Sequence, residues 1–550
     1  MQVAKLIGGA GTGKTADLLR TMQQTVAHLG GDVMQVGFCS FTRAARREAA
    51  RRAADQFNVP VYQLEQAGWF RTLHSTCMKC LGVGEALLTD CKESRQWIEN
   101  AVQAPIGLAG READGYYTEN TDERQSDATR ALHFWAAARN RLESLAAVWQ
   151  EAEHTDPQTP PLDYCQQIID RYEESKRLDH RLDFVDLLAQ FAGWRFSAEY
   201  GATRCEPRGE PPALNAWFFD EQQDVSALLH AVCERLASES QWVYVAGDPF
   251  QSIYGWCGAH PKWLMGWPAD KERVMPRSYR CPAPVLALAE RVLSRCSDYW
   301  DRRITPAEHE GDCETATKLD DLGLDPRDDW LLLSRTNYLA GKFGDYLDRN
   351  GIPWVSTRGG GRWNAPVRSA AIQALRNLEA GAPIDGGEWR QVLKYLQSRE
   401  NGDQLLTRGT KKRFADMEDA QTQYPWVMRH DLTELGATEA LIAGIKRGKW
   451  QQWIEGAADY TQAVDRWGAE AVAKPGIRVG TIHSAKGAEA DNVMVCTTLS
   501  GPCIRGAETP EGHDEQQRVF YVGVSRARRR LVILNDPRVF PRARQELPSL

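Results

Sequence analysis

Short apolar segments recur along the chain and alternate with longer segments whose apolar residues repeat at helical spacing. Each apolar segment is bounded by polar or turn-forming residues, as is typical of strands that are buried on both faces of a parallel sheet. These segments are residues 3–7, 33–41, 216–221, 241–248, 329–336, 478–484 and 492–497. Because strands and helices alternate, the pattern predicts an α/β fold with helices on the faces of parallel sheets.

Two long stretches interrupt this alternation. Residues 88–176 and 384–474 are polar and rich in helix-favouring residues, so they predict two mostly helical insertions. The 550 residues are enough for several cores, since a single core stops growing at about 250–300 residues. We therefore expect two sheet-based domains, each with one insertion. The first domain comprises 1–87 and 177–272 around the insertion 88–176, and the second comprises 273–383 and 475–550 around the insertion 384–474.

The composition narrows the class of protein. No run approaches the roughly 18 apolar residues of a membrane helix, and the chain starts directly with a motif, so we expect a cytoplasmic protein without a membrane partner. The 13 cysteines are scattered, and the close pair Cys77 and Cys80 has no second pair at zinc-finger spacing, which favours reduced thiols. The formal net charge of −7 argues against binding of nucleic acid through overall charge, so any such binding must use local patches.

One local patch is an arginine-rich segment that begins at Arg43. Its arginines recur at helical spacing, which would place several of them on one helix surface: Arg43, Arg46, Arg47, Arg51 and Arg52. A solvated helix face explains the same pattern, so both interpretations stay open.

The most specific motif is the glycine-rich segment 8–15, which fits GxxxxGK[ST] between an expected strand and an expected helix. In such a loop, backbone N–H groups and the helix N-terminus bind phosphates, the lysine neutralises β- and γ-phosphate oxygens, and the hydroxyl group binds Mg²⁺. The segment therefore predicts ATP and Mg²⁺ as cofactors. The expected ligands of the nucleotide are Gly8, Gly9, Ala10, Gly11, Thr12, Gly13, Lys14 and Thr15.

Two acidic residues follow the apolar segment that starts at residue 216. ATP hydrolysis needs a carboxylate for the metal and a group that orients the attacking water. Asp220 and Glu221 lie where a parallel sheet presents its catalytic edge. We therefore expect Asp220 to bind the metal together with Thr15, and Glu221 to act on the water.

Eight sequence blocks follow the phosphate loop in the order that is found in superfamily 1 helicases. They are FTRAA (41–45), TLHS (72–75), DFVDLL (183–188), DEQQD (220–224), VAGDPFQSIYGWCGA (245–259), SYRCP (278–282), VGTIHSAKGAEADNV (479–493) and EQQRVFYVGVSRAR (515–528). The chain therefore resembles the UvrD/Rep/PcrA family of DNA helicases over almost its whole length. The resemblance implies two RecA-like P-loop NTPase domains, each with a mostly helical insertion, and a nucleotide bound between the two domains.

The resemblance also implies roles for residues at the nucleotide. Arg280 and Arg526 match arginine fingers that reach the γ-phosphate from the second domain, and such a finger can be worth about 10³–10⁵ in rate. Gln251 matches a residue that senses the γ-phosphate from the first domain. The catalytic set is then Lys14, Asp220, Glu221, Gln251, Arg280 and Arg526. Further nucleotide contacts are expected from the adenine-stacking Tyr279, the ribose-contacting Glu489 and the nearby Gly487.

Proteins that bind single-stranded nucleic acid without sequence preference stack the bases on aromatic side chains, at about 1–3 kcal/mol per base. Tyr254 and Trp256 match family positions that stack on bases. Other candidates lie in blocks that line the DNA path in relatives, namely Phe41, Thr42, Arg43, Thr72, His74 and His483. Packing in the core is the alternative for the aromatic residues, because 19 Trp exceed what a DNA path could use.

The leading hypothesis is ATP-dependent movement along single-stranded DNA with unwinding at single-strand/duplex junctions, and the resemblance implies 3′→5′ polarity. Only seven residues precede Gly8, which leaves no place for the family's adenine-reading Q motif, so other nucleoside triphosphates are plausible substrates. The second insertion is shorter than its usual counterpart. The alternatives are a translocase that displaces proteins with little unwinding, and a nucleotide-gated DNA-binding protein with a vestigial ATPase. We expect a monomer in the absence of DNA; a loading protein is not identified, and RNA is a less favoured track.

Overall fold

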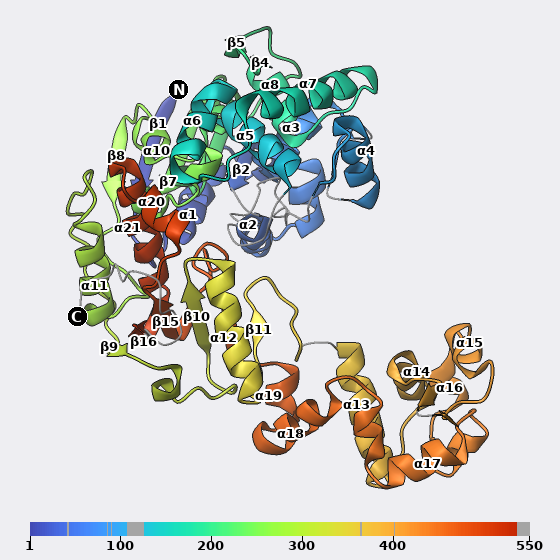
Figure 1. The fold of residues 1–550 in the computed structure, drawn as a ribbon. Helices are drawn as coiled ribbons and strands as arrows, with labels where there is room; N and C mark the ends of the chain where they lie inside the picture. Colours follow the sequence, from blue (N-terminus) through green and yellow to red (C-terminus); the bar gives the residue numbers. More distant parts are fainter. Residues whose placement is uncertain are drawn as a thin grey trace.

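The chain forms two six-stranded sheets, in each of which all neighbouring strands run parallel. The structure is a computed structural model that describes residues 1–40, 43–84, 86–89, 91–106, 126–363, 366–400 and 402–535. Helices cover both faces of each sheet (Figure 1). The expected α/β fold with two parallel-sheet domains is therefore confirmed.

The first sheet has the strand order β3-β2-β6-β7-β1-β8. Phe38 and Phe218 on one face pack in a core with α1 and α2, whereas Cys39 and Phe219 on the other face pack in a core with α3, α8 and α9. We call this sheet and its helices the first lobe. Its elements are β1 (Gln2–Ile7), α1 (Lys14–His28), β2 (Val36–Ser40), α2 (Arg43–Phe57), β3 (Trp69–Thr72), α3 (Leu73–Leu81), α8 (Phe184–Ala192), the hairpin β4 (Trp194–Ser197) and β5 (Gly201–Arg204), β6 (Ala216–Phe219), α9 (Ala227–Ala237), β7 (Trp242–Gly247), α10 (Pro261–Met265) and β8 (Lys271–Val274).

The second sheet has the strand order β11-β14-β10-β15-β16-β9. Leu332 and Met494 face α12, whereas Leu331 and Val493 face the core that also contains α11 and α21. That core is continuous with one core of the first lobe, so the two lobes are packed together. We call this sheet and its helices the second lobe: α11 (Ala283–Leu293), β9 (Asp312–Ala316), β10 (Trp330–Ser334), α12 (Asn337–Arg349), β11 (Val355–Ser356), β14 (Ile477–Thr481), β15 (Ala490–Cys496), α20 (Gly501–Gly506), α21 (Pro510–Val524) and β16 (Ala527–Leu534).

Some strands are not recognisable from an apolar pattern. Strand β16 has three successive arginines after its first residue, Ala527, and two of them bind acidic residues of neighbouring segments. Arg528 donates to Asp329 at 2.8 Å, and Arg530 donates to Glu314 at 2.6 Å. Strand β8 lies at the edge of its sheet and three of its four residues are exposed. Both strands therefore lack the uniformly apolar sequence of a central strand.

The first insertion consists of the helices α4 (Lys92–Val102), α5 (Asp127–Arg141), α6 (Leu145–Thr155) and α7 (Leu162–Leu178). Buried ion pairs join it to the N-terminus of α8 in the first lobe. Arg139 of α5 lies 2.7 Å from Asp183, and Lys176 of α7 lies 2.7 Å from Asp186. Because removing one partner of a buried ion pair leaves an uncompensated charge, separation of the insertion from the lobe at this junction would be costly.

The second insertion has its own core, and most of it lies apart from the two sheets in Figure 1, although its Trp467 donates to the carbonyl oxygen of Gly351 in the second lobe at 2.9 Å. Its elements are α13 (Pro366–Glu379), α14 (Gly386–Tyr395), the hairpin β12 (Arg399–Glu400) and β13 (Asp403–Gln404), α15 (Thr410–Ala415), α16 (Ala420–Gln423), α17 (Glu439–Lys446), α18 (Ala457–Trp467) and α19 (Ala469–Ala473). The core includes Trp363 and Leu375, so it extends to the N-terminal side of residue 384, and the exact domain boundaries stay predictions. Every helix among the described residues is too short or too polar to span a lipid bilayer.

Candidate functional site

The phosphate loop lies between the end of β1 at Ile7 and the start of α1 at Lys14. Gly11 has a φ of +68°, and a β-carbon at this position would lie 2.3 Å from the Cβ atom of Arg280, which belongs to the second lobe. Only glycine therefore allows both the left-handed turn and the close approach of the second lobe. The Nζ atom of Lys14 is buried and donates to the carbonyl oxygen of Gly9 at 3.2 Å, so its charge lies inside the loop.

The two acidic candidates lie beside this loop, directly after β6. The hydroxyl group of Thr15 donates to Asp220 Oδ2 at 2.6 Å, which brings the two expected metal ligands together. Burial, followed by the charge of Glu221, raises the pKa of Asp220 to about 6. Burial would also raise the pKa of Glu221, but the charges of Lys14 and Lys486 outweigh it and lower that pKa below its usual value. Glu221 is therefore the more readily ionised member of the pair.

The backbone of Glu221 has a φ of +56°, in the left-handed region. This conformation costs a non-glycine residue about 1–2 kcal/mol. Its side chain accepts a hydrogen bond from Gln223 Nε2 at 2.5 Å, which fixes the direction of the carboxylate. Strained residues often occur at functional sites, where the surrounding contacts maintain them.

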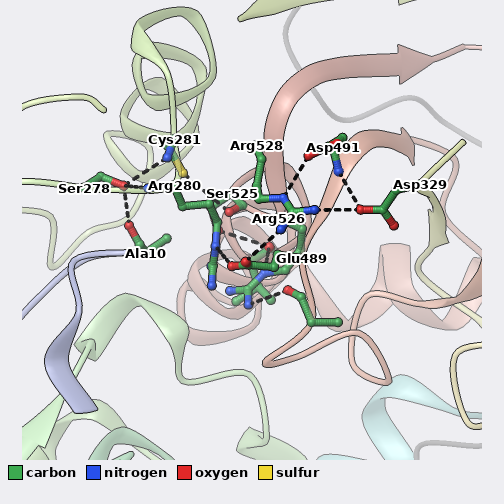
Figure 2. A network of polar contacts seen from close by, with 12 residues as sticks. Ala10, Ser278, Arg280, Cys281, Asp329, Glu489, Asp491, Ser525, Arg526 and Arg528 are labelled. Atoms are coloured by element: carbon green, nitrogen blue, oxygen red, sulfur yellow. Dashed lines mark hydrogen bonds and ion pairs between the residues drawn. The ribbon is translucent and has the colours of Figure 1, made fainter. Parts of the chain in front are cut away.

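Both predicted arginine fingers lie at the contact between the lobes. Arg526 Nη2 donates to Gln251 Oε1 at 3.1 Å, and Arg280 Nε donates to Glu489 Oε2 at 2.6 Å. Figure 2 shows Arg280, Glu489 and Arg526 gathered in one group. Burial, together with the charge of Arg280, lowers the pKa of Arg526 to about 10. Arg526 is buried and Arg280 is partly buried, and two cations that lie close together attract a polyanion.

Tyr279 lies at the mouth of the phosphate loop. Its backbone N–H donates to the carbonyl oxygen of Gly11 at 2.8 Å, and its side chain is 67% exposed. The ring lies 3.9 Å from the position that a β-carbon would occupy if Gly13 were replaced by a larger residue. Gly487, which the resemblance also places near the nucleotide, has a φ of +83° and open space around its α-carbon. An exposed ring beside the loop agrees with the expected stacking on a base, which stays a prediction.

The predicted DNA contacts differ in their exposure. Tyr254 is buried, and its ring lies 6.1 Å from that of His483, whereas Trp256 is only partly buried. His74 is partly exposed and lies edge-on to Phe184 at 5.8 Å. The side chain of Thr72 caps α3 by accepting from Ser75. Phe41 and Thr42 lie outside the described residues, as does the side chain of Arg43, whose backbone begins α2.

Comparison with known proteins identifies the family. The model of the UvrD/REP helicase N-terminal domain matches residues 2–271, and that of the UvrD-like helicase C-terminal domain matches residues 466–536. The chain belongs to the UvrD/Rep helicase family. Members of this family are expected to use ATP, and Lys14 and Arg526 lie within the two matched regions.

Similarity to individual UvrD/Rep proteins extends over nearly the whole chain. YjcD of Bacillus subtilis (strain 168) is 22% identical, and the match covers 96% of this chain and 76% of YjcD. UvrD2 of Mycobacterium tuberculosis (strain ATCC 25618 / H37Rv) is 24% identical with coverage of 96% and 76%. PcrA of Leuconostoc citreum is 21% identical with coverage of 96% and 79%. UvrD2 and PcrA are named ATP-dependent DNA helicases.

The structure of this UvrD/Rep protein adds residues that the sequence reasoning missed. Lys486 Nζ reaches from the second lobe to Asp224 of the first lobe at 2.5 Å and also donates to the carbonyl oxygen of Gln251 at 2.6 Å. Tyr521 accepts a hydrogen bond from the N–H of Ala10 at 3.0 Å and donates to Asp248 at 2.9 Å. Both residues lie inside the quoted sequence blocks, but a pattern alone does not show which side chains cross between lobes.

The oxygen atoms near the phosphate loop fit a Mg²⁺ ion that arrives with the nucleotide. Mg²⁺ is usually held by one or two protein ligands together with phosphate oxygens and waters. Thr15 and Asp220 supply two adjacent oxygens of this kind. Within the described ranges, no group of three or more His, Cys, Asp or Glu side chains is arranged to hold a metal without the nucleotide.

Proposed function

We propose that the protein is an ATP-dependent DNA helicase that couples ATP hydrolysis to movement along single-stranded DNA and to unwinding of duplexes. The observation that carries this proposal is the contact between Arg526 and Gln251, which brings a cation of the second lobe to the wall of the site that contains Lys14. Membership in the UvrD/Rep family and the names of the relatives support it. All residues of the proposed site come from one chain, so a monomer suffices to complete it.

The proposed chemistry divides the roles between the two lobes. Lys14 and the loop N–H groups neutralise the phosphates, while Thr15 and Asp220 hold Mg²⁺. An ion held there would supply positive charge that offsets the charge of the phosphate groups. Glu221 orients the attacking water and accepts its proton, which its lowered pKa permits. Arg280 and Arg526 then stabilise the charge that develops on the transferred phosphoryl group.

Movement follows because the nucleotide contacts both lobes. A ligand shifts a conformational equilibrium only by its differential affinity for the two states. ATP binds both walls when the lobes are closed, whereas hydrolysis removes the γ-phosphate that joins them. We propose that Trp256 and Tyr254 contact DNA bases during this cycle, and that the motor moves 3′→5′ on DNA in the cytoplasm. The polarity rests on the family resemblance alone.

A single-turnover strand-displacement assay on 3′-tailed and 5′-tailed DNA duplexes tests the proposal. We expect displacement that needs ATP, occurs with the 3′-tailed duplex, and disappears in Lys14→Ala. Displacement of the 5′-tailed duplex alone would reverse the proposed polarity. Removal of streptavidin from biotinylated DNA without strand displacement would favour a translocase that unwinds little. DNA binding without ATP turnover would contradict the motor function.

A further inference from the structure

Both polar backbone groups of Gly255 are bound by charged side chains from other parts of the chain. The N–H of Gly255 donates to Glu515 Oε1 at 3.0 Å, and its carbonyl oxygen accepts from Arg141 Nη2 at 3.2 Å. Gly255 begins the short 3-10 helix Gly255–Cys257, which carries Trp256. The proposed DNA-stacking residue, Trp256, thus follows a residue whose N–H and carbonyl groups are both held by charged side chains.

The two charged side chains come from the second lobe and from the first insertion. Glu515 lies on α21 of the second lobe, whereas Arg141 is the last residue of α5 in the first insertion. Arg141 also contacts Glu151 of α6 at 2.5 Å. The same helix α6 touches the second lobe, because Arg505 donates to the carbonyl oxygen of Thr155 at 2.7 Å. The first lobe, the second lobe and the first insertion therefore meet around the loop of Trp256.

The packing at Gly255 depends on the absence of a side chain. A β-carbon at this position would lie 2.7 Å from Glu515 Oε2 and 2.9 Å from Oε1 and Cδ. The carboxylate of Glu515 therefore rests directly on the α-carbon of Gly255. This close fit makes the contact sensitive to small shifts of α21 relative to the loop.

Among the described residues, none forms a hydrogen bond with the Trp256 side chain that would fix its orientation. Its indole Nε1 is buried and has no hydrogen-bond partner within the described part of the chain. Its ring lies edge-on to Tyr254 with the ring centres 6.4 Å apart. The direction of the indole ring is therefore set mainly by packing and by the backbone of its loop, which includes Gly255.

We propose that Glu515 is a positioning residue that transmits closure of the lobes to Trp256, and so links the nucleotide site to the DNA site. Arg526 lies two residues beyond α21, the helix that carries Glu515. A rotation of the second lobe that withdraws Arg526 from Gln251 also withdraws Glu515 from Gly255, because a helix moves as a rigid element. This inference rests on the proposed function, since it requires Trp256 to contact DNA.

The rate of ATP hydrolysis, measured at increasing concentrations of single-stranded DNA, tests the inference. In Glu515→Ala we expect the rate without DNA to stay within about twofold of wild type. The DNA concentration for half-maximal stimulation should rise about 10-fold or more, because a hydrogen bond to a charged group is lost. Glu515→Gln should recover most of the loss, because its side-chain oxygen still accepts a hydrogen bond. Glu511→Ala changes an exposed residue of the same helix and should behave like wild type.

A second variant reaches the contact from the opposite side. Gly255→Ala should displace the carboxylate and reproduce the phenotype of Glu515→Ala, and the double variant should be no worse than either single one. An oligonucleotide with 2-aminopurine reports stacking directly, and its fluorescence change on binding should shrink in both variants.

Two outcomes separate this inference from the proposed function. If Trp256→Ala loses the stimulation by DNA and Glu515→Ala stays within about twofold of wild type, the positioning role is overturned and the proposed function stands. If the wild-type protein shows no stimulation by DNA, both are overturned.

Discussion

The guanidinium group of Arg526 lies 3.1 Å from the side-chain oxygen of Gln251, and this hydrogen bond joins the two lobes beside the phosphate loop. Gln251 belongs to the 3-10 helix Pro249–Gln251 after β7, and Arg526 follows α21. The two residues are 275 positions apart in sequence. This geometry supports the proposed ATPase site between the lobes, because neither lobe alone supplies both the phosphate loop and the second-lobe cations.

Substitution of Lys14 by alanine should abolish ATP hydrolysis without unfolding the protein. The Nζ atom makes one hydrogen bond at 3.2 Å within the loop, so its removal costs the fold little. Loss of the charge at the developing oxyanions should lower kcat by about 10²–10³ or more. Phosphate release measures the rate, and thermal unfolding should give an unchanged midpoint. A variant with the wild-type rate would contradict the role of Lys14.

The requirement for Mg²⁺ should increase at acidic pH. The pKa of Asp220 is raised to about 6, and the metal binds the ionised carboxylate. Below that pH, the Mg²⁺ concentration for half-maximal ATP hydrolysis should rise about tenfold per pH unit. Asp220→Asn should remove this dependence along with most activity. An identical Mg²⁺ requirement at pH 5.5 and pH 7.5 would count against Asp220 as the ligand.

The same pKa has a consequence for stability without nucleotide. Because the folded-state pKa of Asp220 lies above its ordinary value of 3.8, the folded protein binds the proton more tightly than the unfolded chain does. This residue's contribution to the free energy of unfolding therefore falls as the pH rises from about 4 through about 6. Asp220→Asn should flatten the pH dependence of urea unfolding in this window. An equally steep dependence in the variant would contradict the raised pKa.

Removal of the Tyr521 hydroxyl should destabilise the contact between lobes. Tyr521→Phe deletes the donor to Asp248 and leaves the N–H of Ala10 without this acceptor. The expected loss is about 1–3 kcal/mol in the free energy of unfolding by urea. Tyr346→Phe removes a comparable bond to Asp320 at an exposed position and should change stability by less than about 0.5 kcal/mol. Equal effects of the two substitutions would show that burial of the Tyr521 network is unimportant.

The attachment of the first insertion to the first lobe should depend on Arg139. Arg139→Ala removes the guanidinium group that lies 2.7 Å from the buried carboxylate of Asp183 and leaves it with Lys176 at 3.1 Å, so we expect a cost near the lower end of about 3–5 kcal/mol. Urea unfolding measures the loss. Arg177→Ala removes an exposed ion pair of the same insertion with Glu174 and should leave the unfolding midpoint unchanged. A small effect of Arg139→Ala would mean that water or a neighbouring cation replaces the guanidinium.

Much of the fold is predictable because central parallel strands are apolar on both faces. Strands such as β6 and β10 are fully buried, and their sequences show it. Strand β16 is not recognisable, because Arg528 and Arg530 bind acidic residues of neighbouring segments. The core of the second insertion includes α13, which composition alone assigns to the preceding domain. Such cases depend on tertiary pairing that has no local signal.

The candidate site also combines residues that have a local sequence signal with contacts that depend on tertiary packing. The phosphate loop and the acidic pair follow from local motifs, because their chemistry requires particular residue types at fixed spacing. The resemblance to the helicase family brings in Arg280 and Arg526. The link between Tyr521 and the loop, and that between Glu515 and Gly255, are contacts over 511 and 260 positions in sequence. No spacing rule predicts such contacts, which appear only when the lobes are packed together.

The most direct test of the central claim is the rate of ATP hydrolysis in saturating single-stranded DNA for Arg526→Ala, compared with Arg530→Ala. Arg526 reaches the first lobe, whereas Arg530 binds Glu314 within the second lobe. We expect Arg526→Ala to lower kcat by about 10³ or more while ATP still binds, and Arg530→Ala to retain the wild-type rate. Equal rates for Arg526→Ala and wild type would contradict a nucleotide site that is completed by the second lobe.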